Sequence, residues 1–485
     1  MPIPMDSFIE ARTDTALTRE ISARYRVDIS GMDQACLRVH KERLTLCPRS
    51  VMGSPRDDVL LVHEIDGNSM WVPRQYGMQH WGADASVRDD TTHGALMSPA
   101  ARFAATLKHE QVDVVRQAMD HLLPDAGRPT GAVLNLYCGF GKTVVALHIA
   151  RQIGRRTIVL VHTTMLLTQW VERVRQFLGV EAGVIQRDRV DHDHDVVVGM
   201  LPSFHAREYD AAVIDSFGLV IVDEAHHVPA ATYFRTVSKF RPRHVLGLTA
   251  TPHRADGLTQ LLYWTIGPCV CSLEREVNSD VRIECITYHG KSREILTRDG
   301  KPLLACMVTT LALSRARNEM LTAVIVQKAR QGRRIIVLSD RVKQLHWLRE
   351  RLATEGVATG TCIAVTNAHD REAARSATVL LTTWCMSREG LDIPELDTLV
   401  MASPKSDVVQ AIGRILREAP GKKPPHVVDV CDGFSLFLNL QRKRAAYYRK
   451  QGFAVSQRSY ELNSPGPLLA STTSSRSGVG GGDEV

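Results

Sequence analysis

The sequence lacks several features that would mark whole classes of protein. It has no run of about 18 apolar residues, which a membrane-spanning helix needs. It contains 10 cysteines but no Cys-x-x-Cys pair, so the spacing of a structural zinc site is missing. The first thirty residues carry acids such as Asp6 and Glu10 and no apolar core, so no secretory signal is expected. The scattered cysteines therefore indicate reduced thiols in an intracellular protein.

The composition is that of a folded protein with several domains. The chain has 485 residues, of which 44% are hydrophobic and 23% are charged. A length of this size predicts about three domains. The net charge of +7 is compatible with an anionic partner such as nucleic acid, although alone it is a weak argument.

From about residue 103 onward, short apolar runs alternate with segments of helical periodicity. Residues 157–161 and 219–222 belong to a first series of such runs, and residues 378–382 and 427–430 belong to a second. Because continuous apolar strands separated by helices are typical of parallel sheets covered on both faces, we predict two α/β units in tandem. The predicted regions are an N-terminal accessory region with a β-hairpin (1–98), a first domain (99–272), a linker or bridging segment (273–319), a second domain (320–455) and a disordered tail (456–485).

A glycine-rich turn follows the predicted strand 131–136 and precedes a predicted helix. Gly139 and Gly141 lie in this turn, and Lys142 and Thr143 follow them. Such a turn directs backbone N–H groups and a helix N-terminus at one point, where a phosphate can bind. Lys142 would then reach the β- and γ-phosphates, and the Thr143 hydroxyl would bind Mg²⁺. The full pattern has glycine where this chain has Leu136, and an ordinary strand–turn–helix is the alternative.

A second apolar strand ends in two carboxylates. Asp223 and Glu224 directly follow residues 219–222. A carboxylate at the end of a strand beside a phosphate loop is suited to hold Mg²⁺, which assigns this role to Asp223. Glu224 is placed to orient and deprotonate an attacking water. The alternative, a helix N-cap in a solvated loop, does not explain why a phosphate loop precedes it.

Several ordered segments resemble the motifs of superfamily 2 helicases of the DEAH-box type. Residues 223–226 have the sequence Asp-Glu-Ala-His, and the other segments are 107–111, 161–170, 247–257, 389–394 and 410–417. Residues 72–77 and 428–435 are similar to segments in the helicase-like ATPases of large nucleocytoplasmic DNA viruses. The resemblance covers almost the whole chain. One position departs from the pattern, because Trp384 stands where the fifth motif usually has threonine.

The resemblance implies an α/β fold with two tandem RecA-like parallel-sheet domains of the P-loop NTPase type. It also implies that ATP and Mg²⁺ bind, with Mg²⁺ at Thr143 and Asp223. The implied nucleotide-binding residues are Gln111, Gly139, Gly141, Lys142, Thr143, Asp223, His226, Gly390 and Asp392, and the implied catalytic residues are Glu224, Arg414 and Arg417. Gln111 would contact adenine. The two arginines lie three positions apart, so on a helix they would share one face and could both approach the γ-phosphate.

The implied function is an ATP-dependent helicase or translocase that moves along or unwinds DNA or RNA. Its grip would be on the phosphate backbone, and no membrane is expected as a partner. Viral transcription or replication is the expected process, with the transcription machinery as a further partner, in a host cytoplasm, host nucleus or virion. Two alternatives stay open: a translocase that strips proteins or transcripts without unwinding, and an assembly protein that uses ATP as a clamp. The basic segment 441–450 is either part of a nucleic-acid track or a solvated helix.

Overall fold

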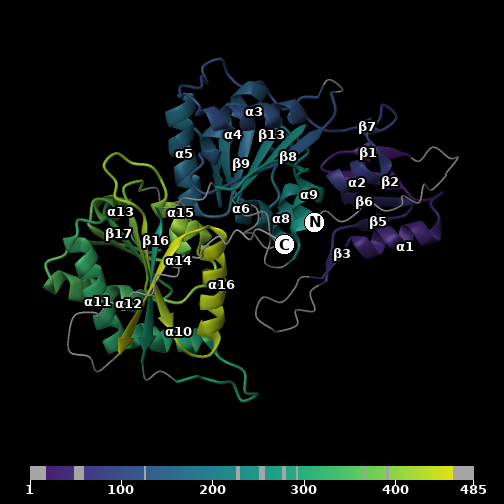
Figure 1. Cartoon of the computed structure of the whole chain (residues 1–485). Helices are drawn as coiled ribbons and strands as arrows, with labels where there is room; N and C mark the ends of the chain where they lie inside the picture. The colour runs from purple at the N-terminus through teal and green to yellow at the C-terminus, as the bar shows by residue number, and fades with distance from the viewer. Residues whose placement is uncertain are drawn as a thin grey trace, which may run out of the picture. The chain divides into compact units, whose positions relative to one another are not determined.

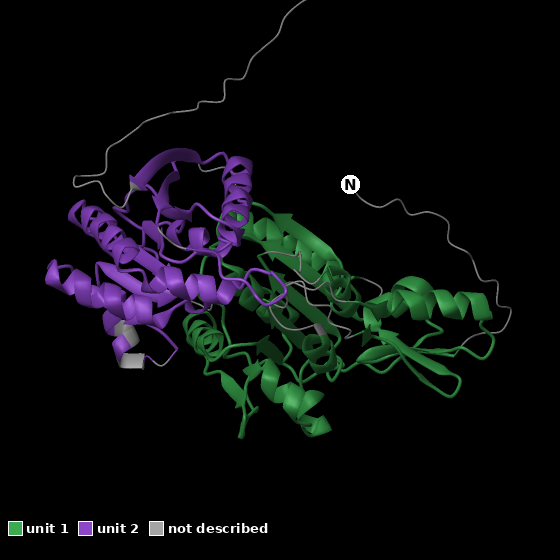
Figure 2. Cartoon of the chain, turned by 90° about the horizontal axis from the view of Figure 1, so that it is seen from below, with its two compact units in different colours: residues 1–274 green, residues 275–485 purple. Residues whose placement is uncertain are grey.

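The computed structural model forms two compact units, residues 1–274 and 275–485 (Figure 2). It describes residues 18–47, 59–124, 127–224, 230–250, 257–275, 280–290, 293–364, 366, 368–388 and 393–461. Within these residues, no helix is both long and apolar enough to pass through a lipid bilayer.

The N-terminal region forms a small five-stranded sheet with the order β5-β6-β2-β1-β7. Its elements are β1 (Arg19–Ile21), β2 (Arg24–Asp28), α1 (Gln34–Arg43), β3 (Thr45–Leu46), β4 (Leu60–Leu61), β5 (Glu64–Asp66), β6 (Ser69–Pro73), α2 (Arg74–Trp81) and β7 (Arg88–Asp89). Strands β5 and β6 form a hairpin. Residues 59–63, which the sequence favours as its first arm, instead contain β4, and β4 pairs with β3. The core under this sheet includes Phe234 and Leu261 from the following domain, and the buried Arg74 donates to the Pro242 carbonyl over 2.7 Å. The accessory region thus shares its core with the first domain.

The first large sheet has eight strands in the order β11-β10-β12-β9-β13-β14-β8-β15. Neighbouring strands in this sheet are parallel, except that the edge strand β11 is antiparallel to β10. The elements are α3 (His109–Leu122), β8 (Thr130–Leu136), α4 (Lys142–Ile153), β9 (Thr157–Val161), α5 (Thr164–Leu178), β10 (Gly183–Gln186), β11 (Arg189–Asp191), β12 (Val196–Met200), α6 (Leu201–Ala206), α7 (Ala211–Ile214), β13 (Leu219–Asp223), α8 (Ala230–Val237), β14 (His244–Thr249), α9 (Thr259–Thr265) and β15 (Cys269–Leu273).

Helices cover both faces of this sheet (Figure 1). Helices α3, α4 and α5 contribute to one apolar cluster, and α6, α8 and α9 contribute to another. Every residue of the central strands β9 and β13 is buried. This double coverage explains why the strands are continuous apolar runs rather than alternating ones.

The second unit contains a seven-stranded, wholly parallel sheet with the order β18-β19-β17-β20-β21-β16-β22. Helices α11 and α12 pack on one face, and α14, α15 and α16 contact strands of the same sheet (Figure 1). The elements are β16 (Arg282–His289), α10 (Leu304–Leu313), α11 (Arg315–Arg330), β17 (Ile335–Ser339), α12 (Val342–Thr354), β18 (Thr359–Cys362), α13 (Ala368–Arg375), β19 (Val379–Thr383), α14 (Trp384–Arg388), β20 (Thr398–Met401), α15 (Val409–Ile415), β21 (His426–Asp432), α16 (Leu436–Lys450) and β22 (Ala454–Glu461).

Two predicted regions differ from the structure. The predicted linker 273–319 contains β16, a full strand of the second sheet, and the predicted tail 456–485 begins inside β22. Both strands contain polar residues, so neither is the uninterrupted apolar run by which the other strands are predicted. In β16 the buried Glu284 is paired with Lys328 over 2.6 Å, so a charged residue can occupy the sheet interior. In β22 most described side chains are exposed, as expected at a sheet edge.

Candidate active site

The phosphate loop joins the buried strand β8 to helix α4. Gly139 and Gly141 have φ values of +89° and +99°, a region that side chains with a Cβ rarely adopt. Gly141 is the residue at the N-terminal cap of α4, and Lys142 is its first helical residue. The loop therefore places unpaired N–H groups of the first helical turn next to Lys142, an arrangement suited to phosphate.

Gln111 fastens α3 to this loop. Its Nε2 donates to the Phe140 carbonyl over 2.8 Å, and its Oε1 accepts from the Lys108 N–H over 2.9 Å. A Cβ at position 141 would lie only 2.6 Å from Gln111 Nε2, so a larger residue there would displace the Gln111 amide. The buried amide still has one N–H and one lone pair that these two bonds do not use, so it can also contact a ligand.

Lys142, Asp223 and Glu224 form a charged cluster at the ends of α4 and β13. The Lys142 Nζ lies 3.0 Å from Glu224 Oε1, and both side chains are largely buried. Asp223 is buried as well, and its Oδ2 accepts from the Trp170 indole over 2.8 Å. Strand β13 lies between β9 and β14, so the two carboxylates are fixed at the centre of the sheet edge.

The electrostatics of the cluster favour a bound cation. Burial, and after it the neighbouring Glu224 carboxylate, raise the pKa of Asp223 to about 6. Burial alone would lower the pKa of Lys142, but the attraction of Glu224 and Asp223 outweighs it and the pKa is raised. A buried carboxylate with a raised pKa gains from additional positive charge beside it.

The backbone at Glu224 is in an unusual conformation. Its φ is +48°, in the left-handed region, and its N–H donates to the Leu248 carbonyl over 3.0 Å. A non-glycine residue held there costs on the order of 1–3 kcal/mol, and such residues cluster at functional sites. The turn at the end of β13 thus directs Glu224 to Lys142 at the cost of backbone strain.

Similarity to known proteins agrees with this geometry. Residues 104–254 match the family model described as the res subunit of type III restriction enzymes. A protein of Acanthamoeba polyphaga mimivirus, named as an ATP-dependent RNA helicase, is 26% identical over 448 residues, which cover 89% of this chain and 85% of that protein. A protein of Escherichia phage T5 named as a helicase is 28% identical over 331 residues, or 66% of this chain and 72% of that one.

The fold agrees as well. Saccharomyces cerevisiae Dbp5, solved with RNA and ADP–BeF3, superposes with a TM-score of 0.50 at 14% identity over 76% of this chain and 94% of that chain. The chain resembles ATP-dependent helicases in sequence and superfamily 2 helicases in fold. It is an ATP-hydrolysing enzyme, and the predicted pair of RecA-like domains is confirmed by its two parallel sheets.

The second unit of the helicase places the two motif arginines differently from each other. Arg414 lies in α15, is buried, and donates from Nε to the Ser387 carbonyl over 2.9 Å. Helix α15 ends at Ile415, so Arg417 lies beyond it and is only half-buried. The prediction that both arginines share one helix face is therefore wrong. Residues 416 and 417 form a turn and a bend after the helix.

Other predicted site residues are accounted for as follows. Thr143 is the second residue of α4, beside Lys142. The predicted ligands His226, Gly390 and Asp392 lie outside the described residues. Trp384, the departure in the fifth motif, is buried and donates from Nε1 to Ser403 Oγ over 3.0 Å, so its ring belongs to the core of the second domain.

Sequence reasoning missed Trp170 as the partner of Asp223. It lies in the segment 161–170, whose resemblance points to nucleic-acid contact. The spacing of Leu166, Leu167, Trp170 and Val174 gives a helical stripe that faces the sheet, and this period was the available signal. It could not reveal that the indole N–H reaches a carboxylate.

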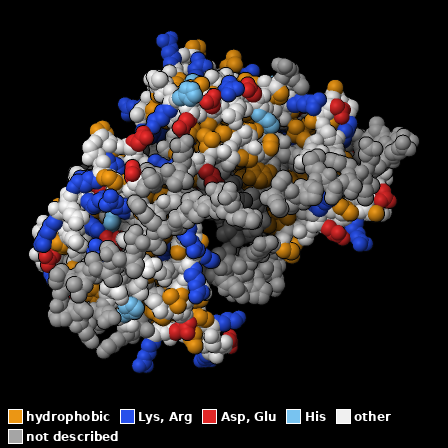
Figure 3. Space-filling view, in the orientation of Figure 1, with side chains coloured by type: hydrophobic (Ala, Val, Ile, Leu, Met, Phe, Trp, Pro, Cys, Tyr) orange, Lys and Arg blue, Asp and Glu red, His pale blue; other side chains and the backbone are white. Residues whose placement is uncertain are grey.

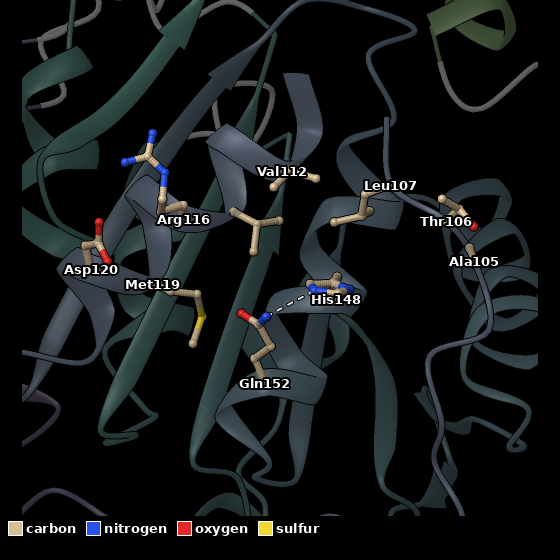
Figure 4. A pocket seen from close by; sticks show the side chains of 10 residues that line it. Ala105, Thr106, Leu107, Val112, Arg116, Met119, Asp120, His148 and Gln152 are labelled. Atoms are coloured by element: carbon tan, nitrogen blue, oxygen red, sulfur yellow. Dashed lines mark hydrogen bonds between the residues drawn. The ribbon is translucent and has the colours of Figure 1, made fainter. Parts of the chain in front are cut away.

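The helicase also has a separate pocket of about 530 Å³ beside α3 and α4 (Figure 4). It is lined by apolar side chains such as Leu107 and Val112 together with Arg116 and Asp120. Gln152 and His148 are hydrogen-bonded across its floor over 3.1 Å. None of Lys142, Asp223 and Glu224 lines it, so it is distinct from the charged cluster.

The residues of the cluster fit ATP and Mg²⁺. The Asp223 carboxylate and the Thr143 hydroxyl are oxygen ligands, which Mg²⁺ prefers. The positive φ values of Gly139 and Gly141 shape the backbone of the loop, and Lys142 supplies a positive charge. The donor set therefore suits a magnesium-bound triphosphate.

Proposed function

We propose that this helicase is of the DEAH-box type and uses ATP to move along or unwind nucleic acid during viral transcription or replication. The observation that carries the proposal is the buried cluster of Lys142, Asp223 and Glu224 at the phosphate loop. Relatives named as RNA helicases, from large DNA viruses, support RNA as a substrate and an intracellular site of action. The transcription machinery is the partner that this role would require.

In the proposed mechanism, Glu224 is the general base. Its carboxylate is held by Lys142 at 3.0 Å, and the ammonium has three donors, so it can contact a phosphate while it still holds Glu224. Glu224 then accepts the proton of the attacking water. Asp223 and Thr143 would hold Mg²⁺, which when bound neutralises charge on the phosphates. Trp170 keeps Asp223 in position through its indole N–H.

The arginines of the second unit have the remaining proposed role. Arg414 and Arg417 would stabilise the negative charge that develops on the γ-phosphate, as the resemblance implies. Arg414 donates here to the Ser387 carbonyl, so it would have to exchange this partner for phosphate oxygens during turnover. Arginine suits the role because it is always charged and its planar fork matches phosphate oxygens.

The test is ATP turnover measured with single- and double-stranded DNA and RNA. We expect nucleic acid to stimulate turnover, Lys142→Ala to lose ATP binding, and Arg414→Ala to bind ATP but turn over on the order of 10³-fold more slowly. Arg414→Lys is the control, because it keeps the positive charge but lacks the planar guanidinium group. If nucleic acid does not stimulate turnover, the chain is not a motor. The alternative of an assembly protein that uses ATP as a clamp would then remain. Strand displacement against streptavidin displacement separates unwinding from translocation.

A further inference from the structure

Helix α16 carries five basic residues and no acidic residue, and the structure divides them into two groups. Arg444 faces inward and is buried, with Nε 2.9 Å from Asp429 Oδ2. Tyr448 is buried beside it and donates to the same oxygen over 2.9 Å. Arg444 is therefore unavailable to an external ligand, and it fixes the rotation of the helix.

The remaining four basic residues form one exposed stripe, Arg442, Lys443, Arg449 and Lys450. The second pair follows the first by two helical turns, so all four lie on one side of α16, over about 10 Å at a rise of about 1.5 Å per residue. Figure 3 shows Lys and Arg side chains gathered over this helix. We call these four residues the α16 stripe.

Within the part of the chain that the structure describes, three residues of the α16 stripe have no ion pair that would offset their positive charge. Among the described residues, no carboxylate forms an ion pair with Arg442, Lys443 or Arg449. Helix α12 of the same unit differs, because its Arg351 pairs with Glu319 over 3.0 Å and with Glu355 over 3.4 Å. Mixed charges like those around α12 are typical of a solvent-exposed helix face.

The helix dipole explains the positions of only two of the four residues in the α16 stripe. Arg449 and Lys450 lie in the last turn, where cations interact favourably with the helix dipole. Arg442 and Lys443 lie in the middle of α16, where the dipole gives them no such advantage. The helix dipole therefore does not account for Arg442 and Lys443.

We infer that the α16 stripe binds the phosphate backbone of a nucleic-acid duplex. A duplex carries one negative charge per about 1.7 Å of its axis, so a stripe of about 10 Å meets several phosphates. Bases of a single strand would need an exposed aromatic ring for stacking. The stripe offers none: Tyr448 is buried and Tyr447 packs its ring against Tyr448 and Phe453. The inference rests on the proposed function and adds a contact outside the helicase motifs.

The test is the salt dependence of duplex binding, measured by fluorescence anisotropy with the full chain. Arg442→Gln with Lys443→Gln removes the two cations that the helix dipole does not explain. We expect the slope of log affinity against log salt to fall by about 1 for each side chain removed. The matched control is Lys343→Gln with Arg349→Gln, which removes one exposed lysine and one exposed arginine from α12 and should leave the slope unchanged.

Each outcome decides a separate point. If the wild-type protein binds no nucleic acid, the proposed function fails. If it binds and the α16 double variant has the wild-type slope, or both double variants lose equally, the stripe is not a duplex site. A variant that keeps duplex binding but loses binding to vesicles rich in phosphatidylserine would assign the stripe to a membrane instead. Thermal unfolding of both variants establishes that each is folded.

Discussion

Both parallel sheets bury carboxylates, but the two sheets treat them in opposite ways. In the first unit, burial and the nearby Glu224 raise the pKa of Asp223 to about 6. In the second unit, burial would raise the pKa of Glu284, but hydrogen bonds from His426 and Lys328 outweigh it and lower the value to about 2. The charge of Asp432 is also balanced, because Arg317 donates to both of its carboxylate oxygens over 2.8 and 2.9 Å.

The difference separates a carboxylate held for a ligand from one held for the fold. Among the described residues, the Asp223 and Glu224 carboxylates lie beside a single lysine, Lys142, and the raised pKa of Asp223 shows that added positive charge would be favourable there. Glu284 contacts Lys328, His426 and Arg458, so its charge is balanced without any ligand. The direction of the pKa shift, rather than burial itself, distinguishes the two cases.

The largest expected effect is on chemistry at the first sheet. Glu224→Gln keeps the size of the side chain but cannot accept a proton, so turnover should fall about 10²- to 10⁴-fold. ATP binding and the unfolding midpoint should stay near the wild-type values. Turnover assays and calorimetry measure these quantities, and wild-type turnover would mean that the base lies elsewhere.

The next effect is on stability at the second sheet. Arg317→Met leaves Asp432 buried without its partner, which should cost about 3–5 kcal/mol of unfolding free energy. Denaturant unfolding measures the loss. The double variant Arg317→Met with Asp432→Leu should recover most of it, because neither charge then remains. A single variant as stable as the wild type would mean that the buried pair does not hold the fold.

A pH comparison without nucleotide or Mg²⁺ should give opposite trends for the two sheets. Because the pKa of Asp223 is raised, its favourable contribution is complete below about pH 3.8 and is lost as pH rises through about 6. Asp223→Asn should therefore stabilise the protein at pH 7, by on the order of 3 kcal/mol, and not at pH 3.5.

The contribution of Glu284 to stability depends on pH in the opposite direction. Its lowered pKa gives a contribution that is present above about pH 4.5 and is lost as pH falls towards about 2. Glu284→Gln should therefore destabilise the protein at pH 7, by a similar amount, and less at pH 3. Unfolding free energies at both pH values check the pair, and parallel trends would remove the distinction drawn between the sheets.

The smallest expected effect concerns Trp384. Trp384→Phe loses the hydrogen bond to Ser403 and leaves a small cavity in the core, a cost of about 1–3 kcal/mol. Ser403 Oγ also accepts from the Asp340 N–H over 2.8 Å, so it is not left without a partner. Nucleic-acid-stimulated turnover should not change, and a large loss of turnover would show that the ring has a direct role in the motor.

The sequence predicted most of the first sheet and its site because their signals are local. Strand β13 is an uninterrupted apolar run that ends at Asp223, and the phosphate loop is contiguous, so chain order alone brought Lys142 and Glu224 together. The partner of Asp223, Trp170, comes from a helix 53 positions earlier. Its hydrogen bond depends on the packing of α5, which no local pattern specifies.

The second unit was harder to predict because its strands are not all apolar. β16 contains Glu284 and β22 contains Arg458, and the two side chains are paired over 3.1 Å across adjacent strands. Partners from distant segments balance the charge of Glu284, and Arg458 lies partly exposed on an edge strand, so neither segment looks like a strand by itself. The extent of α15 was missed for a similar reason, since a repeat of three predicts a shared face only while the helix continues.

The pairing of β16 with β22 has a consequence for biosynthesis. These neighbours run in register from Arg282↔Ala454 to His289↔Glu461, so the first and last strands of the second unit are joined only late in translation. Until then β16 presents an open edge, which is a template for pairing with other chains. Such distant contacts also form slowly. A chain truncated before residue 454 would thus lack β22 and be prone to aggregate, even if its first unit had already folded.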